Sequence, residues 1–105
     1  TDDVNVSAVI ELKVNPQRGM GFDRIAEKIY HFPEVEDLYL MSGGYDFMVK
    51  LKKAPMRDIA AFVSSRLSVI DEVQSTTTHV VLKQYKDHGT MFVGKSGDKR
   101  MVVTP

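Results

Sequence analysis

The stretch VNVSAVIELKV, residues 4–14, decides the fold. Apolar side chains recur at every second position along it, a period typical of a β-strand with one buried face. Further along, apolar residues in 22–29 are spaced at i, i+3, i+4 and i+7, which predicts an amphipathic helix. Pro33 ends that helix because proline lacks a backbone donor and clashes with the preceding turn.

The same order of elements then recurs. We predict strands over 35–41 and 47–52, a second helix from Pro55 to Ile70, and a last strand from Val73 to about Tyr85. The two halves also match residue by residue. Ile10, Leu12 and Val14 correspond to Phe47, Val49 and Leu51 at an offset of 37, and 32–35 corresponds to 70–73 at an offset of 38.

This internal repeat predicts the fold class. We expect an α+β protein, a ferredoxin-like βαββαβ sandwich with a four-stranded antiparallel sheet and two helices on one face. We expect residues 1–86 to form one domain and residues 87–105 to form a C-terminal extension. In that extension, 91–93 and 101–103 could pair as a hairpin. The alternative is a frayed tail with basic residues.

Two helices on one face leave the other sheet face uncovered. Thr76, Thr78, Val80 and Leu82 form one alternating set of the last strand, and the residues between them form the other. The sequence leaves open which set faces the helices. A second copy of the chain is the simplest cover for an exposed apolar face, so we expect self-association.

Composition excludes several classes of protein. Fourteen basic residues balance fourteen acidic ones, which argues against direct nucleic-acid binding by this chain. The absence of cysteine excludes disulfides and thiolate chemistry. No apolar run reaches the roughly 20 residues of a membrane span. The sequence therefore predicts a cytoplasmic domain without a membrane partner.

Constellations for catalysis or metal binding are missing. His31, His79 and His88 lack the spacing of a metal-binding pair. The acidic residues within 34–37 follow a helix end, where we expect a solvated surface. No serine or threonine has a base placed to activate it. We therefore expect no enzyme, no cofactor and no metal.

One constellation fits a small ligand. It comprises the glycine turn Ser42, Gly43, Gly44, Tyr45 and Asp46 together with the hydroxyls of Thr76 and Thr78. Glycine turns expose backbone N–H groups to an anion, and a carboxylate can receive an ammonium group. These residues would suit the zwitterionic end of an amino acid. The alternative is a tight hairpin turn that binds nothing.

At these residues the sequence resembles the C-terminal domain of the Lrp/AsnC, or feast/famine, transcription regulators. The resemblance runs from about Val6 to Lys86. It rests on a diffuse pattern in 8–14, 32–35, 42–47, 70–73, Thr76, Thr78 and 80–82. The chain departs from the family pattern at Glu72, where glycine is usual, and at Gly44, where a polar or acidic residue is common.

The resemblance implies more than composition does. It implies dimers built by packing sheets face to face, assembly into octamers or other even rings, and amino-acid effectors bound between dimers near 43–46, Thr76 and Thr78. Nothing in the chain resembles the family's N-terminal helix-turn-helix, so we expect either a fragment of a regulator or a stand-alone member. The predicted function is amino-acid effector binding and oligomerisation for a transcription regulator. The alternatives are a ligand-free assembly module and an enzyme on the same fold.

Overall fold

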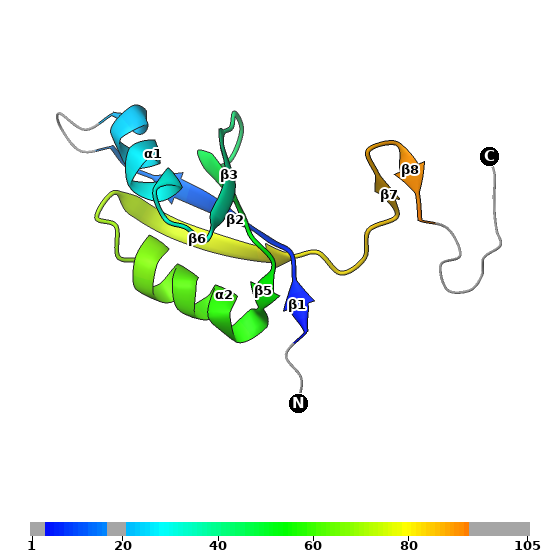
Figure 1. Ribbon diagram of the computed structural model, residues 1–105. Coiled ribbons are helices and arrows are strands. Elements are labelled where there is room, and N and C mark those ends of the chain that lie inside the picture. The colour runs from blue at the N-terminus through cyan, green and yellow to red at the C-terminus, as the bar shows by residue number, and fades with distance from the viewer. Residues whose placement is uncertain (1–3, 17–20, 93–105) are drawn as a thin grey trace.

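The computed structural model describes residues 4–16 and 21–92, shown in Figure 1. The elements follow in chain order. They are β1 (Asn5–Val6), β2 (Ala8–Val14), α1 (Phe22–Tyr30), β3 (Val35–Leu40), β4 (Phe47–Leu51), β5 (Ala54–Pro55), α2 (Met56–Phe62), the π-helix η1 (Val63–Leu67), β6 (Val73–Val80), β7 (Lys86–Asp87) and β8 (Thr90–Met91).

The main sheet has four antiparallel strands in the order β3-β4-β2-β6. The predicted fold class is confirmed, because α1 and α2 both contribute to a single core against this sheet. Strand β2 lies between β4 and β6, so Leu12 pairs with Phe47 on one side and with Thr76 on the other. Figure 1 shows β2 and β6 running side by side through the length of the domain.

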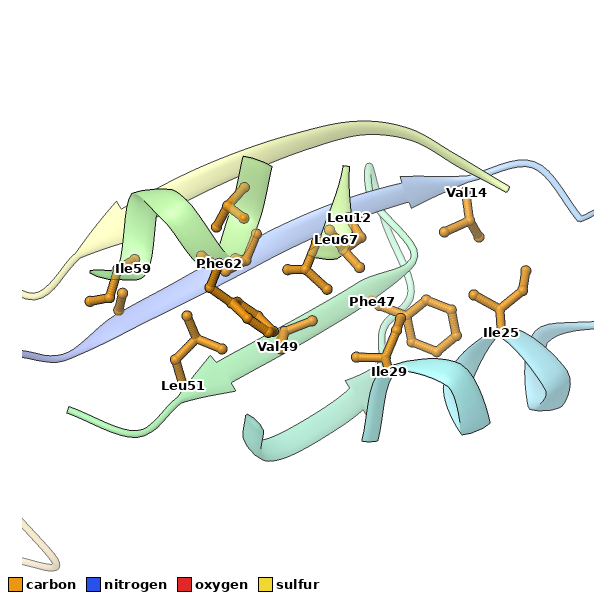
Figure 2. Close-up of a cluster of buried hydrophobic side chains, with 13 residues drawn as sticks. Leu12, Val14, Ile25, Ile29, Phe47, Val49, Leu51, Ile59, Phe62 and Leu67 are labelled. Atoms are coloured by element: carbon orange, nitrogen blue, oxygen red, sulfur yellow. The ribbon is translucent and has the colours of Figure 1, made fainter. Parts of the chain in front are cut away.

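The core forms between the apolar face of the sheet and the apolar faces of the helices. Alternate residues of β2 and β4 are buried, and opposite residues in an antiparallel pair share a face. Ile25 and Ile29, one turn apart on α1, and Ile59 and Leu67 on α2 and η1 are each at most 1% exposed. Figure 2 shows these side chains meeting those of β2 and β4 in one layer.

The second helix changes its winding after Phe62. The Ser68 N–H donates to Val63 O at 2.8 Å, five residues back, as in a π-helix. The hydroxyls of Ser64 and Ser65 both donate to Ala61 O, at 3.3 and 2.6 Å. Such side-chain bonds compete with the backbone ladder, which accounts for the wider turn at this point.

Two predicted strands differ from the structure. The strand predicted over 4–14 divides at Ser7, because β1 turns away to pair with β5. The last strand ends at Val80 rather than near Tyr85. Val81 N–H still donates to Ser7 O at 2.9 Å, but beyond that point the neighbouring strand has left the sheet. A strand cannot continue without a partner for its backbone groups.

The internal repeat is visible in the backbone. Val35 N–H donates to Phe32 O at 3.0 Å, and Val73 N–H donates to Ile70 O at the same distance. Both bonds close the turn that carries a helix into the following strand. The offset of 38 in the sequence therefore corresponds to two turns that are closed by equivalent hydrogen bonds.

The register settles which set of β6 faces the helices. Thr76, Thr78 and Val80 pair with core residues of β2 and share their face. Ser75, Thr77 and His79 lie on the uncovered face, where His79 Nε2 contacts Glu11 Oε2 at 2.9 Å. The same face carries Val9, Lys13, Tyr39, Met48 and Lys50. Leu82 lies beyond the strand.

The chain after β6 leaves the domain and forms a small hairpin, β7–β8, away from the sheet (Figure 1). His88 and Gly89 both have positive φ, 50° and 83°, as a two-residue type I′ turn requires. The hairpin predicted between 91–93 and 101–103 lies largely outside the described residues. The division between residues 86 and 87 stays a prediction. Neither α1 nor α2, in the part described, is long and apolar enough to cross a bilayer.

Candidate functional site

The glycine loop joins β3 to β4 at one end of the sheet. Both backbone groups of its last residue, Asp46, make hydrogen bonds. The Asp46 N–H donates to Leu12 O at 2.9 Å, and the Asp46 carbonyl accepts from Met41 N–H at 2.8 Å. These two bonds close the hairpin and attach it to the central strand.

The Asp46 side chain adds a third attachment. Its Oδ2 accepts a hydrogen bond from Val14 N–H at 2.9 Å, and the residue is half-buried. The carboxylate therefore sits in a defined position at the end of β2. This bond is a structural role that the sequence did not predict, because Val14 is 32 residues away.

The glycines leave the loop backbone open. Gly43 has a backbone φ of 108°, a conformation that residues other than glycine rarely adopt. A Cβ placed on either Gly43 or Gly44 would meet no heavy atom within 4 Å. Ser42 and both glycines are exposed, and Tyr45 is half-buried. The loop thus presents its main chain to solvent beside the Asp46 carboxylate.

Thr76 and Thr78 do not join the loop within one chain. Thr76 and Phe47 pair with Leu12 from opposite sides, which separates their strands by two strand spacings, about 10 Å. Thr78 pairs with Ile10, farther from the loop. The structure therefore brings the predicted site residues to one sheet but divides them between the two sides of β2.

Glu72, where the family usually has glycine, is buried at the turn that leads into β6. It is 4% exposed, and its Oε1 accepts from Lys28 Nζ on α1 at 3.2 Å. A hydrogen bond from backbone at Glu72 itself lowers the pKa of this carboxyl; burial opposes the shift and the Lys28 ammonium adds to it. The carboxylate consequently holds α1 against the start of β6.

Sequence reasoning missed a groove on the other end of the domain. It has a volume of about 530 Å³ and lies between α2 with η1 and the segments 33–34 and 51–54; we call it the α2 groove. Glu34, expected to be solvated, is half-buried and lines it. Lys52, Lys53 and Arg66 line it as well, although only the fold brings them together. Among the described residues, no cluster of acidic or histidine side chains could hold a metal ion.

The element order and the sheet define the class of this protein as a ferredoxin-like α+β domain. A sequence profile of the Lrp/AsnC ligand binding domain matches residues 7–91. The chain therefore belongs to the Lrp/AsnC family, as a ligand-binding domain of transcription regulators. The resemblance noted from the sequence is confirmed.

Relatives and solved structures agree with this family. The chain is 54% identical over 100 residues to YugG of Bacillus subtilis (strain 168), which is named an uncharacterised HTH-type transcriptional regulator; the match covers 95% of this chain and 60% of YugG. A proline dehydrogenase transcriptional activator of Rhodobacter capsulatus is 23% identical over 74 residues, covering 70% of this chain and 48% of that protein. The chain thus spans about half to three-fifths of these relatives.

Two crystal structures show the same fold. The transcriptional regulator NMB0573 of Neisseria meningitidis, solved as a complex with L-Met, superposes with a TM-score of 0.71 at 21% identity over 82% of this chain and 55% of that one. The hypothetical protein PHS023 of Pyrococcus horikoshii gives a TM-score of 0.63 at 25% identity over 79% of this chain and 96% of that one.

Proposed function

We propose that this chain binds an amino-acid effector at the loop Ser42–Asp46 and assembles with copies of itself to serve a transcription regulator. The observation that carries the proposal is the fixed Asp46 carboxylate beside an open glycine backbone. A carboxylate accepts hydrogen bonds from an ammonium group, and exposed N–H groups donate to a carboxylate, so the pair matches the two charges of an amino acid.

A second copy of the chain would complete this site. Thr76 and Thr78 lie across β2 from the loop of their own chain. A neighbouring subunit can supply such groups to the loop, as expected for effectors held between dimers. The complex of NMB0573 with L-Met supports an amino acid as the ligand class.

We also propose that a partner sheet covers the uncovered face. That face carries Val9, Tyr39 and Met48 among polar residues. Tyrosine and methionine are enriched at protein interfaces relative to the rest of the surface. DNA recognition would belong to a helix-turn-helix domain that is separate from the ligand-binding domain matched here. The regulator would act in the cytoplasm. The named relatives are regulators, and we assign this chain no catalytic step.

Calorimetry with the twenty L-amino acids tests the effector site through two substitutions. Asp46→Asn keeps an oxygen acceptor for Val14 N–H but removes the charge, so effector affinity should fall at least tenfold while the melting temperature stays close to wild type. Asp46→Ala should also lose binding, and the lost hydrogen bond should cost about 1–2 kcal/mol of stability. Light scattering should find the oligomer intact in both variants. Unchanged effector binding by Asp46→Asn would contradict the proposal.

A ligand-free assembly module is the second candidate. The bond from Val14 N–H to Asp46 Oδ2 favours it, because that bond gives the carboxylate a purely structural use. Thermal unfolding with each amino acid separates the two functions. A ligand at 100 times its Kd should stabilise the protein by about 2.7 kcal/mol, and no shift with any amino acid would favour the assembly module.

A further inference from the structure

The α2 groove combines an apolar floor with charged walls. Leu51, Ile59 and Phe62 supply the floor, and each also belongs to the hydrophobic core. At about 530 Å³ the groove falls in the size range of small-molecule sites. Such sites bury an apolar body and orient it through a few polar groups.

Five charged side chains surround this floor: Glu34, Lys52, Lys53, Asp58 and Arg66. In the described part of the chain, none of the five makes an ion pair. Charges of both signs around one groove, without partners of their own, provide places for both charges of a zwitterion.

Glu34 carries the strongest sign that a partner is missing. Its Oε1 is shielded from water and has no hydrogen-bond partner. A carboxylate oxygen removed from water without a partner is costly for the folded protein. Glu34 also lines the groove, so a positively charged group bound there would act on the carboxylate as a whole and offset part of that cost.

Arg66 lines the groove from the helix. The π-helix η1 carries it, and its guanidinium Cζ lies 5.6 Å from the centre of the Phe32 ring. Phe32 in turn packs edge-on against Phe62, with ring centres 5.4 Å apart. The stacking fixes the guanidinium beside the floor and leaves its N–H groups for an anion. π-Helical turns are frequent at functional sites.

We propose that the α2 groove is a binding site for an amino acid with a large apolar side chain. The ammonium group of the ligand binds at Glu34, its carboxylate binds at Arg66 with Lys53 nearby, and its side chain packs on Ile59 and Phe62. Both charged ends and the apolar part of the ligand find matching groups in one groove.

This site is distinct from the glycine loop. Strand β4 begins beside Asp46 and ends at Leu51 in the groove, which places the two about 16 Å apart at the rise of an extended strand. The proposal does not depend on effector binding at the loop. A variant at Asp46 leaves every residue of the groove in place.

Calorimetry with three related probes tests it. L-phenylalanine carries both charges, phenethylamine lacks the carboxylate, and 3-phenylpropionate lacks the ammonium group. Glu34→Gln should weaken L-phenylalanine and phenethylamine at least tenfold and leave 3-phenylpropionate unchanged. Arg66→Gln should weaken L-phenylalanine and 3-phenylpropionate at least tenfold and leave phenethylamine unchanged. Amide chemical shifts of 51–54 and 61–66 should move on titration with L-phenylalanine.

Matched controls keep the outcome decisive. Glu36→Gln alters an exposed acid two residues further along the chain and should bind all three probes as wild type does. Circular dichroism confirms that each variant is folded. The proposal is overturned if L-phenylalanine does not bind, or if Glu34→Gln binds it normally. It is also overturned if Asp46→Asn, rather than Glu34→Gln, loses L-phenylalanine, because the loop would then be its only site.

Discussion

Lys28 and Glu72 are 44 residues apart in the chain, yet Lys28 Nζ lies 3.2 Å from Glu72 Oε1. The lysine is partly exposed and the glutamate is buried, so the pair closes the rim of the core between α1 and β6. Asn15 N–H also donates to Glu72 O at 2.7 Å. One residue therefore joins a helix, the loop after β2 and the start of β6.

We predict that Glu72 makes stability depend on pH. Its pKa in the folded protein is lowered from an ordinary value of 4.5. The stabilisation is therefore present above pH 4.5 and is lost as the pH falls through the folded pKa. Glu72→Gln should melt at a lower temperature than wild type at pH 7, and the two melting temperatures should converge as the pH falls below 4.5 and passes through the lowered pKa of Glu72. Glu36→Gln, at an exposed site, should follow wild type throughout; curves of Glu72→Gln and wild type that stay parallel would refute the role.

The two neighbouring glycines should respond differently to alanine. Gly43→Ala forces a side chain into φ of 108° and should cost about 1–2 kcal/mol of stability. Gly44→Ala has open space and no positive φ, so its stability should change by less than about 1 kcal/mol. Urea unfolding measures both. Equal losses in the two variants would show that the loop adopts another conformation.

The uncovered face gives a prediction about assembly. Met48 lies near its centre, opposite Glu11 on β2 and Tyr39 on β3. Met48→Lys would bring an ammonium group into a face-to-face interface, and the cost of removing that charge from water, even beside Glu11, should shift the oligomer towards monomer in light scattering. Val69→Lys, at a position 64% exposed and outside the sheet, serves as the control. An unchanged mass for Met48→Lys would place the interface elsewhere.

Much of the fold could be predicted because it depends on local periods. The alternation in 8–14 and 47–51 and the helical spacing in 22–29 each state which side of an element is apolar. The repeat at an offset of 38 then gives the same turn twice, closed by Val35 and Val73. Strand ends were predicted less well, because β6 stops where its neighbour leaves the sheet.

The candidate site could be predicted only in part. The glycine turn is visible in the sequence, since only glycine readily accepts the backbone at position 43. The hydrogen bond from Val14 N–H to the Asp46 carboxylate could not be predicted, because it depends on the register between β2 and β4. Thr76 and Thr78 share a face by alternation, but their separation from the loop follows from the strand order.

The sequence by itself determined most of the elements, their apolar faces and the repeat, and its resemblance to the Lrp/AsnC pattern indicated the family. The elements and their apolar faces depend on residues a few positions apart, where backbone geometry leaves little choice. Only the tertiary structure decided that Glu72 is buried against Lys28 and that Glu34 shares a groove with Arg66. Those pairings join distant segments. Their neighbours are set by strand order and register, which a local pattern does not specify.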